Sequence, residues 1–168
     1  MRSITTASVF ALLAALSSAV YGAENVEVDL QVHLVHVDAN GQEVLQPAQQ
    51  ASPGDILHYK VICKNNGNTL ARNVLATLPV PAKELVFLKD QSELIGLQAS
   101  TDGKQFGELP LKQFTRAQDG RLFLTEVSAL DYRFLRWNVG DIPAKGSAEV
   151  YARMRVLANS DLAMEVKP

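Results

Sequence analysis

The sequence has very few cysteines and a small net charge. Cys63 is the single cysteine among 168 residues. An intramolecular disulfide and a zinc site built from cysteines are therefore excluded. Sixteen Lys and Arg stand against 18 Asp and Glu, for a formal net charge of -2. Binding to a nucleic-acid backbone needs clustered positive charge, so we expect no nucleic-acid partner.

Catalytic signatures are also lacking. The chain contains no Gly-x-Ser-x-Gly, no His-Glu-x-x-His and no phosphate-binding loop. The three histidines, His33, His36 and His58, are not joined by a second ligand pair at metal-binding spacing. We therefore predict no catalytic residues, no cofactor and no metal site, which makes the protein non-enzymatic.

The turn around Asp38-Ala39-Asn40-Gly41 carries oxygen-bearing side chains, with Glu43 close behind. A calcium loop needs more oxygen ligands in sequence than this segment provides. Asn-Gly accepts positive φ at low steric cost, so the segment predicts a hairpin turn.

No apolar run is long enough to cross a membrane, which takes about 20 residues. The first 23 residues combine a basic start at Arg2, a short apolar run over residues 9–16 and small residues over 17–23. That order is typical of a secretory signal peptide. We expect residues 1–23 to be a signal peptide cut within 19–23, and the product to be periplasmic or extracellular without a membrane span.

Alternation with a period of two dominates the rest of the chain and predicts strands. Apolar residues occupy every even position over 26–34, and the phase then flips, which predicts a bulge near Leu34-Val35. Further strands are expected within 43–45, 55–64, 71–76, 84–88, 113–115, 122–125, 133–139 and 148–156. Turns are expected at 65–68, 101–104 and 118–121, and a short helix fits within 126–131.

These features predict an all-β chain, an immunoglobulin-like antiparallel β-sandwich of about seven or more strands. The sandwich domain is expected over residues 24–157, followed by a C-terminal tail over 158–168.

Two segments carry a family resemblance. Residues 54–67 place Gly-Asp before a Tyr-headed alternating strand and Asn-x-Gly, and residues 137–147 place Trp and Gly before Pro-x-x-Gly. Over about residues 50–157 the chain resembles the conserved-repeat domain of bacterial surface proteins, the domain of unknown function eleven, here in a single copy. The resemblance implies an immunoglobulin-like sandwich in the cell envelope without known catalytic residues.

The residues behind the resemblance have structural explanations. Gly54 and Gly67 suit turns that need positive φ. Asp55 and Asn65 can accept hydrogen bonds from backbone amides. Trp137 is large enough to fill the space between two sheets. The expected structural motif comprises Gly54, Asp55, Tyr59, Asn65, Gly67, Trp137, Gly140, Pro143 and Gly146.

One surface feature suggests binding. If the last two strands pair, as chain order suggests, their outward residues form a patch of aromatics and arginines. The predicted interaction patch is Tyr132, Phe134, Arg136, Tyr151, Arg153 and Arg155.

The sequence therefore favours an exported structural or protein-interaction module, for adhesion or surface assembly. The expected partner is another envelope protein or a surface glycan. A carbohydrate-binding module and, less favoured, an envelope hydrolase remain as alternatives.

Overall fold

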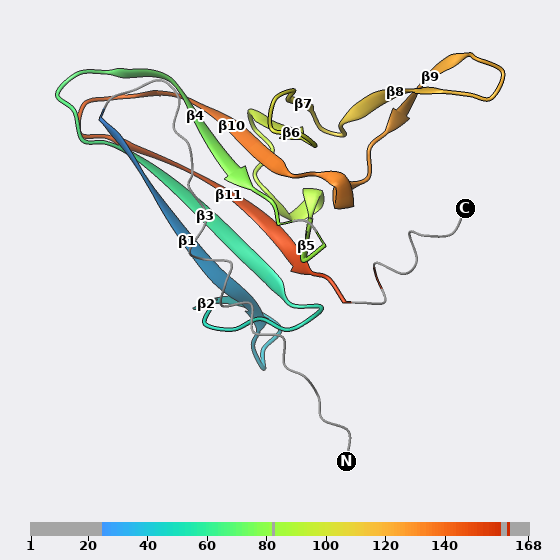
Figure 1. Cartoon of the computed structure of the whole chain (residues 1–168). Helices are drawn as coiled ribbons and strands as arrows, with labels where there is room; N and C mark the ends of the chain where they lie inside the picture. The colour runs from blue at the N-terminus through green and yellow to red at the C-terminus, as the bar shows by residue number, and fades with distance from the viewer. Residues whose placement is uncertain (1–24, 82, 159–160, 162–168) are drawn as a thin grey trace.

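The structure, a computed structural model, describes residues 25–81, 83–158 and 161. The described chain is all-β and forms two packed antiparallel sheets with a separate hairpin (Figure 1). The predicted antiparallel β-sandwich of more than seven strands is confirmed. The expected signal peptide and most of the expected tail lie outside the described residues.

The larger sheet has five strands in the order β2-β1-β3-β11-β5. Their bounds are β1 Val26–Val37, β2 Glu43–Pro47, β3 Ile56–Asn65, β5 Leu85–Phe87 and β11 Ser147–Val156. Alternation predicted the phase of the two central strands. Leu57, Tyr59, Val61 and Cys63 of β3 face the core, as do the even positions 150–156 of β11.

The second sheet has four strands in the order β4-β10-β6-β7. Their bounds are β4 Ala71–Pro79, β6 Leu97–Ser100, β7 Gly107–Glu108 and β10 Phe134–Ile142. The core lies between the two sheets, where Leu135 and Trp137 of β10 are fully buried. The Trp137 indole also donates a hydrogen bond of 2.9 Å to the carbonyl of Glu93.

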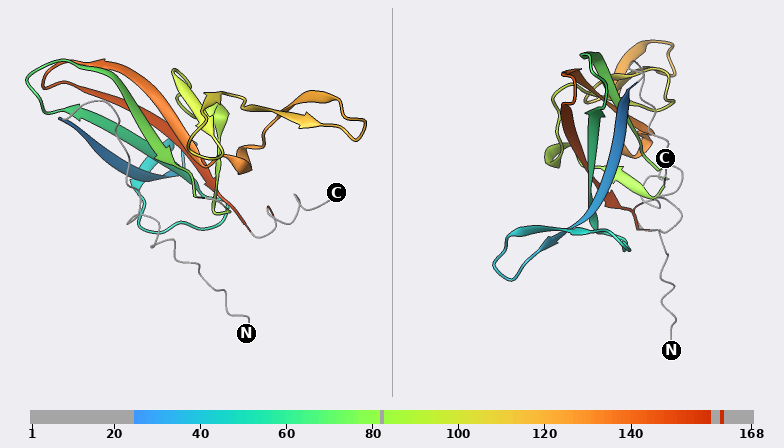
Figure 2. Two further views of the ribbon diagram at one scale, coloured as in Figure 1. Left: turned by 45° about the horizontal axis from the view of Figure 1, so that its top comes forward. Right: turned by 90° about the vertical axis from the view of Figure 1, so that its left-hand side faces the viewer.

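A two-stranded sheet stands apart from the sandwich. It consists of β8 Lys112–Arg116 and β9 Leu122–Glu126. Figure 1 and the left view of Figure 2 show it extending beyond the two sheets. Two 3-10 turns complete the described elements: η2 Lys89–Gln91 and η3 Ala129–Asp131, the second within the span expected to hold a short helix.

Two sequence predictions about backbone shape are wrong. The bulge expected near Leu34-Val35 is not formed, because β1 keeps an unbroken register with β3 up to the Val35–Ile56 pair. Beyond that pair β1 is matched only by β2, so no core lies beneath it and Val37 is 57% exposed. The apolar phase flips there because burial ends.

Gly67 is the second case, since its φ is not positive. Space explains the glycine instead: an added Cβ would lie 3.0 Å from the Asn65 side-chain oxygen. Gly54 does have positive φ, at 94°, as predicted.

Candidate functional site

The predicted patch does not exist as one surface. It required β10 and β11 to pair, but β10 belongs to the four-stranded sheet and β11 to the five-stranded sheet. Phe134 and Arg136 therefore lie on the outer face of one sheet, and Tyr151, Arg153 and Arg155 on the outer face of the other. The connection at residues 143–146 crosses between the sheets, a route that chain order alone did not reveal.

Tyr132 is buried rather than exposed, with 3% of its surface accessible. Its ring packs near Phe87, and its hydroxyl accepts a hydrogen bond from the Leu111 backbone at 3.2 Å. Burial raises the pKa of Tyr132, although the bond from Leu111 opposes that shift. This residue anchors the chain where it leaves the sandwich for β8.

The arginines of the predicted patch are already engaged. Arg136 lies 3.7 Å from the centre of the Phe106 ring and donates to Gln98 at 2.7 Å. Arg153, 17% exposed, forms a two-pronged ion pair with Glu43 at 2.7 and 3.0 Å. Arg155 pairs with Asp161 at 3.1 Å. Side chains held in this way within the molecule offer little to a partner.

Two of the three histidines, His33 and His58, lie on the outer face of the five-stranded sheet. His33 and His58 are directly opposed in the β1–β3 register, and His58 stacks on Tyr151 with ring centroids 5.0 Å apart. Burial, followed by the nearby Arg153, lowers the pKa of His58. Within the described chain, no group of three His, Cys, Asp or Glu side chains is placed to hold a metal ion.

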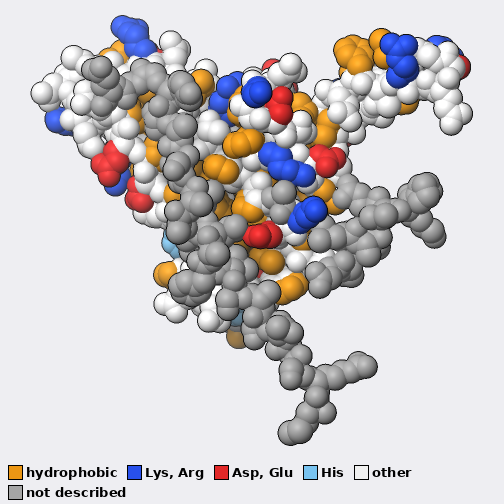
Figure 3. Space-filling view, in the orientation of Figure 1, with side chains coloured by type: hydrophobic (Ala, Val, Ile, Leu, Met, Phe, Trp, Pro, Cys, Tyr) orange, Lys and Arg blue, Asp and Glu red, His pale blue; other side chains and the backbone are white. Residues whose placement is uncertain are grey.

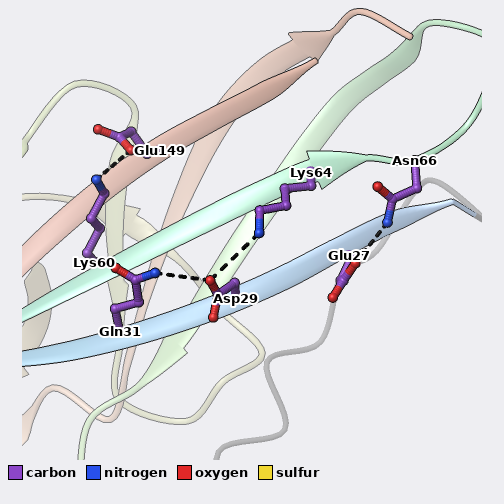
Figure 4. Close-up of polar contacts among 7 residues, drawn as sticks. All are labelled: Glu27, Asp29, Gln31, Lys60, Lys64, Asn66 and Glu149. Atoms are coloured by element: carbon purple, nitrogen blue, oxygen red, sulfur yellow. Dashed lines mark hydrogen bonds and ion pairs between the residues drawn. The ribbon is translucent and has the colours of Figure 1, made fainter. Parts of the chain in front are cut away.

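The rest of that outer face carries a polar ladder (Figure 4). Lys60 pairs with Glu149 at 2.7 Å, and Lys64 lies 3.8 Å from Asp29, which also accepts from Gln31. Such exposed pairs are worth little individually, roughly 0–1 kcal/mol. The face is a mixed, charge-balanced surface.

The two segments that carry the family resemblance meet in space. Asn65, 2% exposed, donates its side-chain amide to the carbonyls of Thr69, Ile142 and Pro143 at 2.8, 3.0 and 3.1 Å. Its side-chain oxygen accepts from the Gly67 backbone at 3.0 Å. Asn65 therefore ties the turn after β3 to the turn between β10 and β11.

The neighbouring motif residues also stabilise turns and strand ends. The Asp55 carboxylate accepts from the Ser52 backbone at 2.7 Å, as its position before the strand predicted. Gly140 has a φ of 78° at a register shift of β10. The Gly146 backbone bonds the Pro143 carbonyl at 2.9 Å, and an added Cβ would approach that carbonyl to 3.0 Å.

The strongest functional candidate is the β8–β9 arm, residues Lys112–Glu126. Register and alternation place Phe114, Leu122 and Leu124 on one face, which we call the apolar stripe. They are 76%, 60% and 53% exposed, and Phe123 on the opposite face is 46% exposed. Figure 3 shows hydrophobic and basic side chains together on the arm. Exposed apolar side chains gathered in this way mark interaction surfaces.

The arm is held at both ends. At its root, the Val127 backbone donates to the Leu111 carbonyl at 2.8 Å, and Leu111 in turn donates to Tyr132. At its tip, the Asp119 carboxylate accepts from the Arg121 backbone and guanidinium. An isolated hairpin is marginal in water, so these anchors position the stripe before any partner arrives.

The sequence predicts this hairpin but not the exposure of its apolar side chains. The signal was present in Leu122-Phe123-Leu124, where consecutive apolar residues make both faces of a strand apolar. The same pattern is typical of a strand that is buried on both faces, so it does not predict that these side chains are exposed.

A half-open groove lies close to the root of the arm. It has a volume of about 410 Å³ and spans β4, β10, β6 and β7. Its lining residues are Leu75, Leu94, Gly96, Leu97, Gln98, Glu108, Leu109 and Asn138. The groove thus combines leucine side chains with the polar groups of Gln98, Glu108 and Asn138.

No helix in the described part of the chain is long and apolar enough to cross a membrane. Comparison of the chain with protein-family models, with curated proteins and with solved structures finds no match.

Proposed function

We propose that this chain is an exported, non-enzymatic module of the cell envelope that binds a protein through the β8–β9 arm. One observation carries the proposal: the stripe of Phe114, Leu122 and Leu124 is exposed on an arm that is hydrogen-bonded to the sandwich at its root. An exposed apolar hairpin has a cost in solubility, and a partner that covers it accounts for its presence.

Site-specific photo-cross-linking in the native envelope tests the proposal. A photoactivatable phenylalanine analogue replaces Phe114 in the full chain, and as a matched control replaces Gln113, which points to the other face of the same strand. We expect protein adducts at position 114 and few at 113, identified by mass spectrometry. Equal labelling at the two positions, or none, would refute the proposal.

A glycan ligand is the second candidate, and it rests on Tyr151, which is 37% exposed. Sugars stack on exposed ring faces, whereas one face of this ring is stacked on His58. Glycan binding that disappears in Tyr151→Ala and persists in Phe114→Ser would favour this candidate over the arm.

A further inference from the structure

The apolar stripe and the groove are complementary in size. A cavity of about 150 Å³ lined by aliphatic side chains is enough to bind a benzene ring. The half-open groove has a volume of about 410 Å³, so it has room for the Phe114 ring together with a neighbouring leucine. Leu75, Leu94 and Leu109 supply its apolar surface, and Leu97 beneath it belongs to the core.

Their charges are complementary as well. Lys112, Arg116 and Glu126 share the stripe face with Phe114, which leaves that face with a net positive charge, and Glu108 lies at the groove. None of these four charged residues takes part in an ion pair within the described residues. A stripe seated in the groove would bring the basic pair toward the acidic group.

The arm is not placed to fill the groove of its own chain. Hydrogen bonds join Val127, Leu111 and Tyr132 at its root, and the left view of Figure 2 shows the arm directed away from the sheets. The groove lies beside the root of the arm, and Glu108 and Leu109 lead from it to β8. Two copies related by a two-fold axis near their roots would each reach the groove of the other.

We propose that the occupant of the groove is the arm of a second copy of this chain, so that two copies exchange arms reciprocally. The contact is isologous, and each copy contributes both an arm and a groove. The two five-residue arm strands and the eight groove residues make 18 residues a side. Stable interfaces of standard size contain about 20–30 residues a side, so this contact is slightly smaller than the standard size, which fits a dimer of modest affinity. This inference rests on the proposed function, since it names the partner of the same arm.

Sedimentation velocity on the full chain over a concentration series tests the exchange. We expect a dimer with a dissociation constant in the micromolar range. Phe114→Ser removes the ring that enters the groove and should weaken the dimer at least about tenfold. Gln113→Ser, on the opposite face of β8, should leave it unchanged.

The groove is tested separately. Leu75→Lys places a positive charge where the basic stripe docks, and it too should weaken the dimer at least about tenfold. Thr77→Lys, two residues along the outer face of β4 and outside the groove, is the matched control. Fluorescence of the buried Trp137 confirms that each variant is folded.

Mixing distinguishes reciprocal exchange from other contacts. A Phe114→Ser chain keeps its groove and a Leu75→Lys chain keeps its arm, so their mixture retains one intact contact and should dimerise more strongly than either alone. Absence of that gain overturns the exchange.

The two proposals fail in different ways. A chain that is monomeric at all concentrations, but is cross-linked at Phe114 to a different protein, overturns the second-copy inference and leaves the proposed function standing. A monomer without position-specific adducts overturns both.

Discussion

Asn65→Ala is expected to destabilise the fold more than most single substitutions do. The side chain holds two turns that are 77 residues apart in sequence, and three of its four hydrogen bonds are no longer than 3.0 Å. A hydrogen bond contributes a net of about 1 kcal/mol, and leaving a buried partner unpaired adds to the loss. The Pro143 carbonyl keeps its bond from Gly146, so about three bonds are effectively lost.

We therefore expect the free energy of unfolding to fall by about 3 kcal/mol. For a domain of this size that corresponds to a melting temperature lower by about 10 °C. Urea unfolding followed by fluorescence is well suited to the measurement, because Trp137 is the single tryptophan and is fully buried.

Asn66→Ala provides the matched control. Asn66 is the exposed neighbour of Asn65, and its side chain makes one surface hydrogen bond, to Glu27. Its removal should change the free energy of unfolding by less than about 0.5 kcal/mol. If the two variants differ by less than about 1 kcal/mol, the role assigned to Asn65 is wrong.

Three further results are expected. Tyr132→Phe removes the acceptor for Leu111 while keeping the ring, and should cost about 1 kcal/mol in urea unfolding, against about 3–5 kcal/mol for Tyr132→Ala; a Tyr132→Phe variant as stable as the parent chain would contradict the anchoring role of the hydroxyl. Burial lowers the pKa of His58, so the unfolded chain binds this proton more readily. Stability is then complete above the ordinary histidine pKa of about 6.5 and declines as the pH falls through it; His58→Gln should flatten the profile between pH 7.5 and about 5.5, and an unchanged slope would exclude His58 as its source. The Cys63 thiol is buried and burial raises its pKa, so a thiol reagent should modify it only in denaturant, and labelling of the folded chain at a rate typical of a free thiol would contradict the burial.

Much of the fold was predictable from local pattern. Alternation placed Leu57, Tyr59, Val61 and Cys63 on the core face of β3, because one face of a strand in a sandwich is buried and the other is not. Turn chemistry likewise placed the hairpin at Asp38–Gly41, where the Asp38 carboxylate accepts from the Asn40 and Gln42 backbones.

The candidate site was not predictable in the same way. The expected patch failed because alternation shows which side chains share a face of one strand but not which strands share a sheet. Strand alternation predicts that the Tyr132 ring faces outward, but this side chain is buried at the root of the arm. The exposure of Phe114 depends on the arm leaving the sandwich, which is a property of the tertiary structure.

Disulfide trapping tests most directly the claim that the arm of one copy occupies the groove of another. One chain carries Phe114→Cys and a second carries Leu75→Cys, and Cys63 does not interfere because it is buried. Reciprocal exchange predicts a covalent heterodimer on mild oxidation of the mixture, and much less when Gln113→Cys replaces Phe114→Cys. No heterodimer, or equal trapping from positions 113 and 114, would contradict it.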